Sequence, residues 1–229
     1  DGLHVEKDMQ KAVAMFTAAT KQKNEYAAYQ LGRLYLAGVD IPKNTPEAVK
    51  WLTLSSDLGN AYAQYALAKL YLSGDGVPKD VGEAIRLFTL SAEQKNEFAA
   101  SQLGKLYLQG ENVPKDVEVA IRWLIASAEQ GNQFAQYALG KLYFYDGEVP
   151  RDKEKSLYWL GLSAAQGNVY AQYLIDNINS YRNPSVLLSA GKSVQGGLPQ
   201  NRRNRYRSYR PQAQTEAAGE KAGAGSQAG

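Results

Sequence analysis

The strongest constraint on this chain is an internal repeat with a period of 36 residues. Residues of one type return at this interval along most of the sequence. They include Asn24, Asn60, Asn96, Asn132 and Asn168; Tyr35, Tyr71, Tyr107 and Tyr143; and Pro42, Pro78, Pro114 and Pro150. A fixed period of this length is typical of solenoids, in which one small unit is stacked many times.

Within one unit, the spacing of apolar residues predicts two helices and no strand. Ala63, Leu67 and Tyr71 fall on one face of a helix, and a second run of the same kind follows a loop. An Asn precedes the first helix, where its side chain can cap the free N–H groups. Asp80 precedes the second helix, and Glu83 three residues later is expected to complete a capping box. Each unit is therefore predicted to be a helix, a loop and a helix.

The register predicts ten helices of two types. First-type helices are expected at 25–37, 61–73, 97–109, 133–145 and 169–181. Second-type helices are expected at 8–22, 45–58, 81–94, 117–130 and 153–166. A pair of such helices cannot bury its apolar stripe alone, so neighbouring pairs must share a core. The predicted fold is all-α, an α/α superhelical solenoid of stacked 36-residue helix-loop-helix repeats.

The register also predicts the domain organisation. Residues 1–182 form the solenoid, with four full units and a half unit at each end. Gly2 aligns with glycines that follow a first-type helix, so the chain starts in the middle of a repeat. Helix 8–22 would then expose Val13 and Phe16, and we expect the natural polypeptide to continue upstream.

The period stops after residue 181, and residues 183–229 are rich in Gly, Ala, Gln, Ser and Arg. This composition is typical of a disordered tail. The tail holds seven Lys or Arg against two Asp or Glu, a net charge of +5, whereas residues 1–182 hold nineteen against twenty-one, a net charge of −2. Polyanion-binding candidates in the tail are Arg202, Arg203, Arg205, Tyr206, Arg207 and Arg210.

The repeat resembles the Sel-one-like repeat family, a relative of the tetratricopeptide repeats. The matching residues of the second unit are Ala63, Leu67, Tyr71, Gly74, Gly76, Val77, Asp80, Ala84, Ala92 and the turn at Gly59 and Asn60. Ala68 departs from the pattern, because its counterparts are glycines. Asp146 likewise replaces a glycine that would end a helix. The resemblance implies a non-catalytic scaffold for protein–protein interaction.

Several classes of function lack their usual residues. There is no cysteine, which removes thiol chemistry and suits a reducing compartment, so a cytoplasmic location is expected. No apolar run is long enough to span a membrane. His4 is the only histidine and is interpreted as a loop residue. The aspartates that recur at helix starts are interpreted as caps and not as catalytic pairs. No catalytic residue, metal or cofactor is predicted, and an enzyme would need a catalytic domain upstream.

The exposed faces of the first-type helices carry three series of repeated residues that are candidates for binding a partner. The first series is aromatic in every unit and comprises Tyr26, Tyr62, Phe98, Phe134 and Tyr170. The second comprises Tyr29, Tyr65, Tyr137 and Tyr173, with Ser101 in the remaining unit. The third is basic and comprises Arg33, Lys69, Lys105 and Lys141. Exposed rings and a row of cations favour binding of an acidic protein segment.

A structural interpretation of these series remains open beside the binding one. The rings could pack between adjacent units, and the cations could form a solvated face paired with Glu25 and Glu97. The three tryptophans, Trp51, Trp123 and Trp159, are interpreted as packing residues and not as a ligand-stacking set.

The main functional prediction is a non-catalytic scaffold that presents an aromatic and basic concave strip to an acidic or extended partner segment. An alternative is a C-terminal accessory module of a nucleic-acid-handling protein, with the Arg/Tyr tail on nucleic acid. Residues 183–188 resemble the end of the repeat region in bacterial mobilisation relaxases. No membrane span and no small-molecule substrate is predicted.

Overall fold

The computed structural model describes residues 8–145 and 147–180, and within them it contains ten helices and no strand. The all-α prediction is confirmed, and each predicted helix is found within two residues at either end. The first-type helices are α2 (Glu25–Ala37), α4 (Ala61–Ser73), α6 (Glu97–Gln109), α8 (Gln133–Phe144) and α10 (Val169–Ser180). The second-type helices are α1 (Met9–Thr20), α3 (Thr45–Asp57), α5 (Val81–Glu93), α7 (Val117–Glu129) and α9 (Lys153–Ala165).

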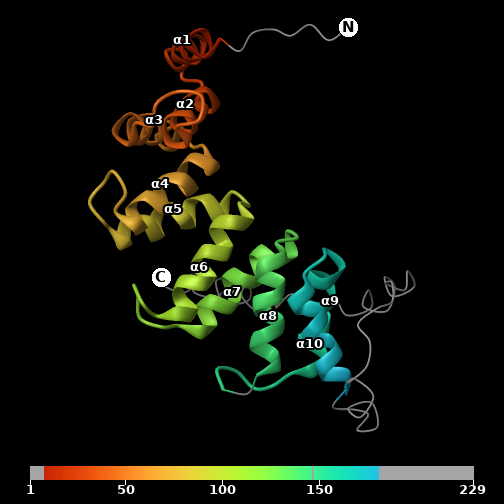
Figure 1. Ribbon diagram of the computed structural model, residues 1–229. Helices are drawn as coiled ribbons and strands as arrows, with labels where there is room; N and C mark the ends of the chain where they lie inside the picture. Colours follow the sequence, from red (N-terminus) through yellow and green to blue (C-terminus); the bar gives the residue numbers. More distant parts are fainter. Residues whose placement is uncertain (1–7, 146, 181–229) are drawn as a thin grey trace, which may run out of the picture.

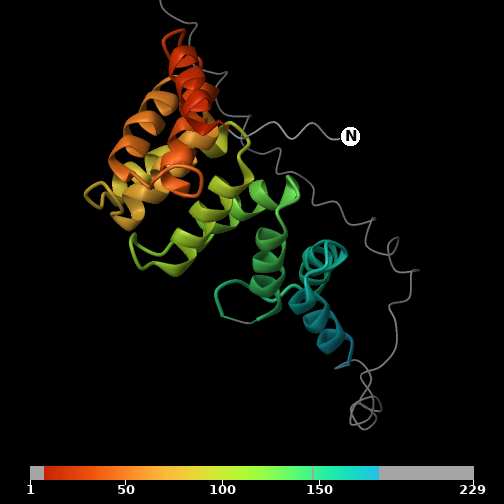
Figure 2. The same cartoon turned by 45° about the horizontal axis from the view of Figure 1, so that its top comes forward.

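The helices are stacked in chain order along a curved path, as Figures 1 and 2 show. The first-type helices α2, α4, α6 and α8 each pack most extensively on the second-type helix that follows, and each second-type helix packs on the next first-type helix. Direct contact also joins α2 to α4 and α6 to α8. In a curved stack, equivalent helices of neighbouring units come closest together on the inner side of the curve. Since the contacts between equivalent helices are made by first-type helices, these helices line the concave side.

The core repeats with the sequence. In the second unit Ala63, Leu67 and Leu70 of α4 are buried, as are Ala84 and Phe88 of α5. Tyr71, Tyr107 and their neighbours pack against this cluster while staying partly accessible. The predicted buried face of the first-type helices is therefore confirmed. The shared core explains how short helices that could not fold alone become stable.

In three units, a glycine on the first-type helix allows the following second-type helix to approach closely. At Gly104 of α6, an added Cβ would lie 2.6 Å from Cγ of Leu124 on α7, a distance shorter than carbon atoms tolerate. Gly32 and Gly140 meet leucines in the same way. Ala68, which departs from this pattern, faces Phe88 in place of leucine, and both are fully buried. Both side chains belong to the same core cluster, so in this unit the extra methyl group is accommodated in the core.

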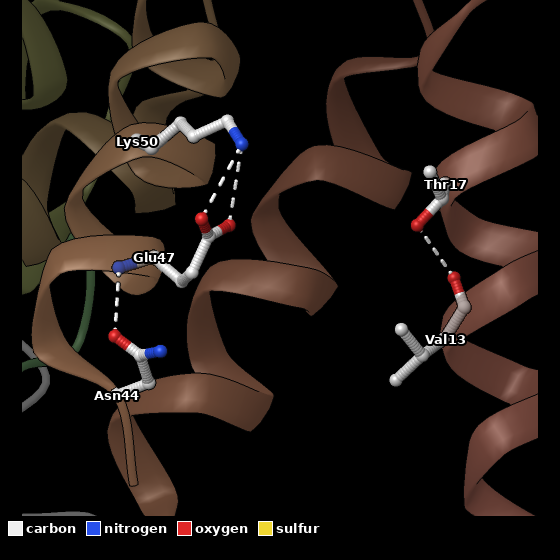
Figure 3. Close-up of polar contacts among 5 residues, drawn as sticks. All are labelled: Val13, Thr17, Asn44, Glu47 and Lys50. Carbon is white, nitrogen blue, oxygen red and sulfur yellow. Dashed lines mark hydrogen bonds and ion pairs between the residues drawn. The ribbon is translucent and has the colours of Figure 1, made fainter.

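The predicted N-caps are present at the start of the helices, but the capping box is wrong in its second half. Figure 3 shows the first half at α3, where the side-chain oxygen of Asn44 accepts from the N–H of Glu47 at 3.1 Å. The Asn44 N–H donates instead to the carbonyl of Tyr35, at 2.9 Å. The Glu47 carboxylate is consequently free to contact Lys50.

The turns between units require a left-handed residue before each Asn cap. Gly59, Gly131 and Gly167 supply it with φ between +91° and +101°. In two other turns the same position is held by Lys23 and Lys95, with φ of +58° and +64°. A side chain is disfavoured in this region of backbone space, so these two turns carry strain that the glycine turns avoid.

The departure at Asp146 has a local consequence for α8. Three other first-type helices end on left-handed glycines, namely Gly38, Gly74 and Gly110. Helix α8 ends one residue earlier in register, at Phe144, and its C-cap Tyr145 is extended. The path of the loop therefore differs in this unit, while the helix packing is unchanged.

Helix α1 is the least covered of the second-type helices. Val13 and Phe16 are half-buried and Met15 is 65% exposed, whereas Leu52, the counterpart of Phe16, is fully buried. Figure 3 also shows α1, where the Thr17 hydroxyl donates to the carbonyl of Val13 at 2.7 Å. The predicted exposure of this face is found in part, and continuation upstream stays a prediction.

Some predictions fall on residues outside the described ones. They concern His4, the boundary at 182, the expected disorder of 183–229 and the six polyanion-binding candidates of the tail.

Candidate interaction strip

The three series of candidate residues lie on the first-type helices, as the sequence predicts. We call them the outer rings (Tyr26, Tyr62, Phe98, Phe134 and Tyr170), the inner rings (Tyr29, Tyr65, Tyr137 and Tyr173) and the strip cations (Arg33, Lys69, Lys105 and Lys141), and together they form the interaction strip. The outer rings are between 48% and 71% exposed. All four strip cations are exposed. Helical spacing places the three series on one face because their members are three and four residues apart.

Most inner rings are partly buried against the core and partly exposed on the surface. Tyr29 and Tyr65 are half-buried and pack against the core, and Tyr65 also lies 5.8 Å from the ring of Phe88. Burial raises the pKa of the Tyr65 phenol, so this hydroxyl stays neutral near pH 7. Tyr173 differs from the other inner rings, since it is 65% exposed. Most inner rings are therefore part of the core packing, whereas the outer rings are exposed and lie outside the core.

Three of the four inner rings, Tyr29, Tyr65 and Tyr137, contact the outer ring of the next unit. The ring centroids are 5.9 Å apart for Tyr29 and Tyr62, 6.2 Å for Tyr65 and Phe98, and 6.5 Å for Tyr137 and Tyr170. These distances lie within the range in which tilted aromatic pairs attract each other. Because the contact joins residues 33 apart, it links neighbouring units along the concave side.

Three strip cations lie over the inner ring of their own helix. The charged group is 5.7 Å from the ring centroid for Arg33 over Tyr29 and for Lys69 over Tyr65, and 5.8 Å for Lys141 over Tyr137. Cations at this distance are attracted by the face of an aromatic ring. The spacing of four residues on one helix is a sequence signal for this contact, which was not among the predictions above.

The pairing of the strip cations with Glu25 and Glu97, which the sequence left as an open interpretation, is not found among the described residues. Neither Glu25 nor Glu97 forms an ion pair with a strip cation. Cations elsewhere on the solenoid do find partners. Lys115 of one loop, for example, pairs with Glu148 of the next, and Arg86 pairs with Glu83 at 2.7 Å. The four strip cations are thus among the cations that have no carboxylate partner within the described residues.

Other candidate residues have structural roles. Trp159 is 2% exposed in the core, and Trp123 packs against the core of the second and third units, which confirms the packing interpretation. Trp51 is half-buried, with Lys50 over its ring at 5.1 Å. The aspartates at the starts of the second-type helices accept from backbone N–H groups and are caps. Among the described residues, no group of three or more acidic or His side chains could hold a metal ion.

A small aromatic cluster at the end of α8 was missed. Phe144 and Tyr145 meet edge to face with their centroids 4.8 Å apart, and Arg151 lies 5.2 Å from the ring of Phe144. The irregular end of α8 creates this cluster, so the 36-residue pattern holds no signal for it.

None of the helices within 8–145 and 147–180 has the length and apolar character needed to cross a membrane.

The chain was compared with known proteins, and no curated protein matches it. A Sel1 repeat protein from Oxalobacter formigenes is 32% identical in sequence, with a TM-score of 0.70, over 77% of this chain and 72% of that one. The protective antigen c5321 of uropathogenic Escherichia coli, described as having an SLR fold, is 34% identical with a TM-score of 0.68. That alignment covers 75% of this chain, which spans only 37% of the antigen's length.

The Sel1 repeat pattern matches five successive segments, at residues 1–24, 25–60, 61–96, 98–132 and 133–168. These segments follow the 36-residue register, and each complete one holds a first-type and a second-type helix. With most of the chain matched and the helices stacked as described, the chain belongs to the Sel1 repeat family.

Proposed function

We propose that the chain is a non-catalytic scaffold whose interaction strip binds an acidic, extended segment of a partner protein. Sel1 repeat proteins generally mediate protein–protein interaction, which supports the broad function. The finer proposal is carried by one observation, the row of four exposed strip cations with no carboxylate partner among the described residues.

Charge favours an acidic partner. Four like charges arranged along one surface repel each other, and a partner with carboxylates at matching intervals removes this repulsion while adding attraction. Exposed ion pairs contribute about 0.2–1 kcal/mol each. A row of four therefore adds about 1–4 kcal/mol in total, which is enough to select acidic segments over neutral ones.

The outer rings favour a partner that covers a large area. Tyr62 and Phe134 are 56% and 71% exposed, although rings of this size usually bury most of their surface. Rigid rings give large contact area at a small loss of side-chain entropy. The rings thus supply affinity, and the cations supply the preference for acidic side chains.

The linear arrangement favours an extended segment. Neighbouring helices in contact lie about 8–10 Å apart, and an extended chain advances about 3.3 Å per residue. Every third residue of an extended partner would then meet an equivalent position in the next unit. We expect the partner to carry Asp or Glu at about this interval.

The test uses a fluorescein-labelled 13-residue peptide with Glu at every third position. Charge reversal of Lys69, Lys105 and Lys141 to Glu should weaken its binding, measured by fluorescence anisotropy, by roughly 5- to 150-fold, because three favourable pairs of up to about 1 kcal/mol are lost. Helical content, measured by circular dichroism, should stay unchanged.

A matched control reverses Lys50, Arg86 and Arg122, which repeat at the same interval on the second-type helices. This variant has the same net charge as the first one, but its changes lie off the strip. It should bind the peptide nearly as well as the original chain. Equal binding by both triple variants would show that the strip is not the binding surface.

The alternative role in handling nucleic acid stays a prediction, because the tail residues that carry it lie outside the described ones. Deletion of 183–229 should remove salt-dependent binding of single-stranded DNA if the tail is responsible. A cytoplasmic location is also part of the proposal, since the lack of cysteine suits a reducing compartment. Cell fractionation would test it.

A further inference from the structure

One place in the interaction strip lacks an inner ring. In three units an inner ring contacts the outer ring of the next unit, as Tyr65 does with Phe98 at 6.2 Å. In the third unit Ser101 stands at the inner position. Phe134, the outer ring that follows it, has no ring contact among the described residues and is 71% exposed, against 48% for Phe98. The strip is therefore interrupted at one junction, between α6 and α8.

The same serine changes the surroundings of Lys105. The other three strip cations each lie over an inner ring four residues earlier on their helix. Lys105 is exposed and has neither a ring nor a carboxylate partner within 8–145 and 147–180. At the other junctions an inner ring lies between an outer ring and a cation. Here the outer ring Phe134 and the cation Lys105 are both present, but the inner ring is absent.

We propose that the partner segment supplies the missing ring. Resting on the function proposed above, this inference specifies the partner as an acidic, extended segment with one aromatic side chain. That side chain lies over Ser101, packs against Phe134 and accepts Lys105 over its face. The arrangement reproduces what Tyr65 and Tyr137 provide from within the chain at their own junctions.

The chemistry of the junction favours an aromatic side chain over an aliphatic one. An aliphatic side chain would cover Phe134 but would gain nothing from Lys105, whereas a ring interacts with both. The serine is small and half-buried, so it leaves space without presenting a charge. Carboxylates on either side of the ring would meet Lys69 and Lys141, the strip cations of the neighbouring units.

The test compares labelled 13-residue peptides that share Glu at every third position. In one set a single Phe replaces each intervening residue in turn, and in the reference peptide every intervening residue is small and polar. The Phe peptide of best register should bind the original chain about 5- to 30-fold more tightly than the reference, the combined effect of one aromatic pair and one cation–π contact.

Filling the open place from within the chain should remove this preference. In S101Y the new ring occupies the site, so the advantage of Phe should fall below about twofold while the reference peptide keeps its affinity. S101A is the matched control, because it removes the hydroxyl without filling the site, and it should keep the preference. Y137S opens an equivalent place beside Lys141 and Tyr170, and it should create a second register at which Phe improves binding.

Each outcome bears on a different claim. Equal binding of the Phe and reference peptides to the original chain, or a preference that survives in S101Y, would refute the missing-ring inference while leaving the scaffold proposal intact. Failure of every peptide to bind would refute both. Binding of a labelled oligothymidine that is lost in S101Y, without peptide binding, would show that the occupant is a nucleobase.

Discussion

The close approach of the two helices at Gly104 predicts that an added methyl group will destabilise the solenoid. In G104A the new Cβ would lie 2.6 Å from Cγ and 2.8 Å from Cδ2 of Leu124, and 3.2 Å from the Ala120 carbonyl oxygen. Overpacking of this kind costs about 1–3 kcal/mol. Alanine offsets about 1 kcal/mol of this through its higher helix propensity. The expected net loss of stability is about 1 kcal/mol.

The second unit shows how the loss should be recovered. There Ala68 faces Phe88, and both side chains are fully buried. Changing Leu124 to Phe in the G104A background reproduces this pair, so the double variant should be more stable than the sum of the single changes predicts. We expect a favourable coupling energy of about 1–2 kcal/mol, within the range measured for residues in contact.

Urea unfolding followed by circular dichroism measures these differences, with the original chain, both single variants and the double variant compared. Because repeat arrays can unfold in more than one step, hydrogen exchange of amides in α6 and α7 should accompany the unfolding curves. The control is G82A, at an exposed helical glycine whose nearest neighbour to an added Cβ is 3.4 Å away. It should stabilise the chain slightly. If G104A were as favourable as G82A, or if L124F gave no rescue, the close-packing argument would be wrong.

Three further predictions concern turns, caps and pH. K95G should stabilise the chain by about 0.5–1 kcal/mol, because a left-handed φ of +64° suits glycine, and thermal unfolding would show a higher midpoint. N132A should destabilise it by about 1 kcal/mol, since the buried Asn132 side chain accepts from the N–H of Ala135 at 2.9 Å, and urea unfolding at constant pH would measure the loss. The hydrogen bond from Arg86 lowers the pKa of Glu83, so this pair stabilises the fold above the ordinary pKa of 4.5 and the contribution is lost as the pH falls through the lowered value. E83Q should therefore reduce stability by less than about 1 kcal/mol at pH 7 and by nothing in strong acid, which a pH series of unfolding curves would detect.

The helices and their N-caps could be predicted because each depends on residues close together in the sequence. An Asn or Asp before an apolar run acts within one turn of helix, whatever surrounds it. The second half of the capping box could not be predicted in the same way. The N–H that Glu83 would have satisfied belongs to Asp80, and it donates to the Tyr71 carbonyl on the preceding helix. That competition depends on how two helices are placed, which the local pattern does not contain.

The interaction strip shows the same division. Exposure of Phe98 and Lys105 followed from helical spacing, because the opposite face of α6 carries the buried alanines and leucines. The contact between Tyr65 and Phe98 did not follow, since it spans two units and depends on the curvature of the stack. Pairing of Glu97 with a cation, one of the interpretations that the sequence left open, is absent among the described residues, because Lys105 lies eight residues further along the same helix, about two turns away.

Two departures from the repeat have opposite consequences. Where the other units have glycine, the second unit has Ala68, and Phe88 replaces the leucine of the other units. Both side chains are fully buried, so a second change within the core compensates for the first. The exchange of tyrosine for Ser101 has no such compensation, and Phe134 and Lys105 are left without the ring that their counterparts contact. A core must be filled for the protein to be stable, whereas a surface can remain open until something binds it. The uncompensated departure is therefore the place in this solenoid where a partner has the most to contribute.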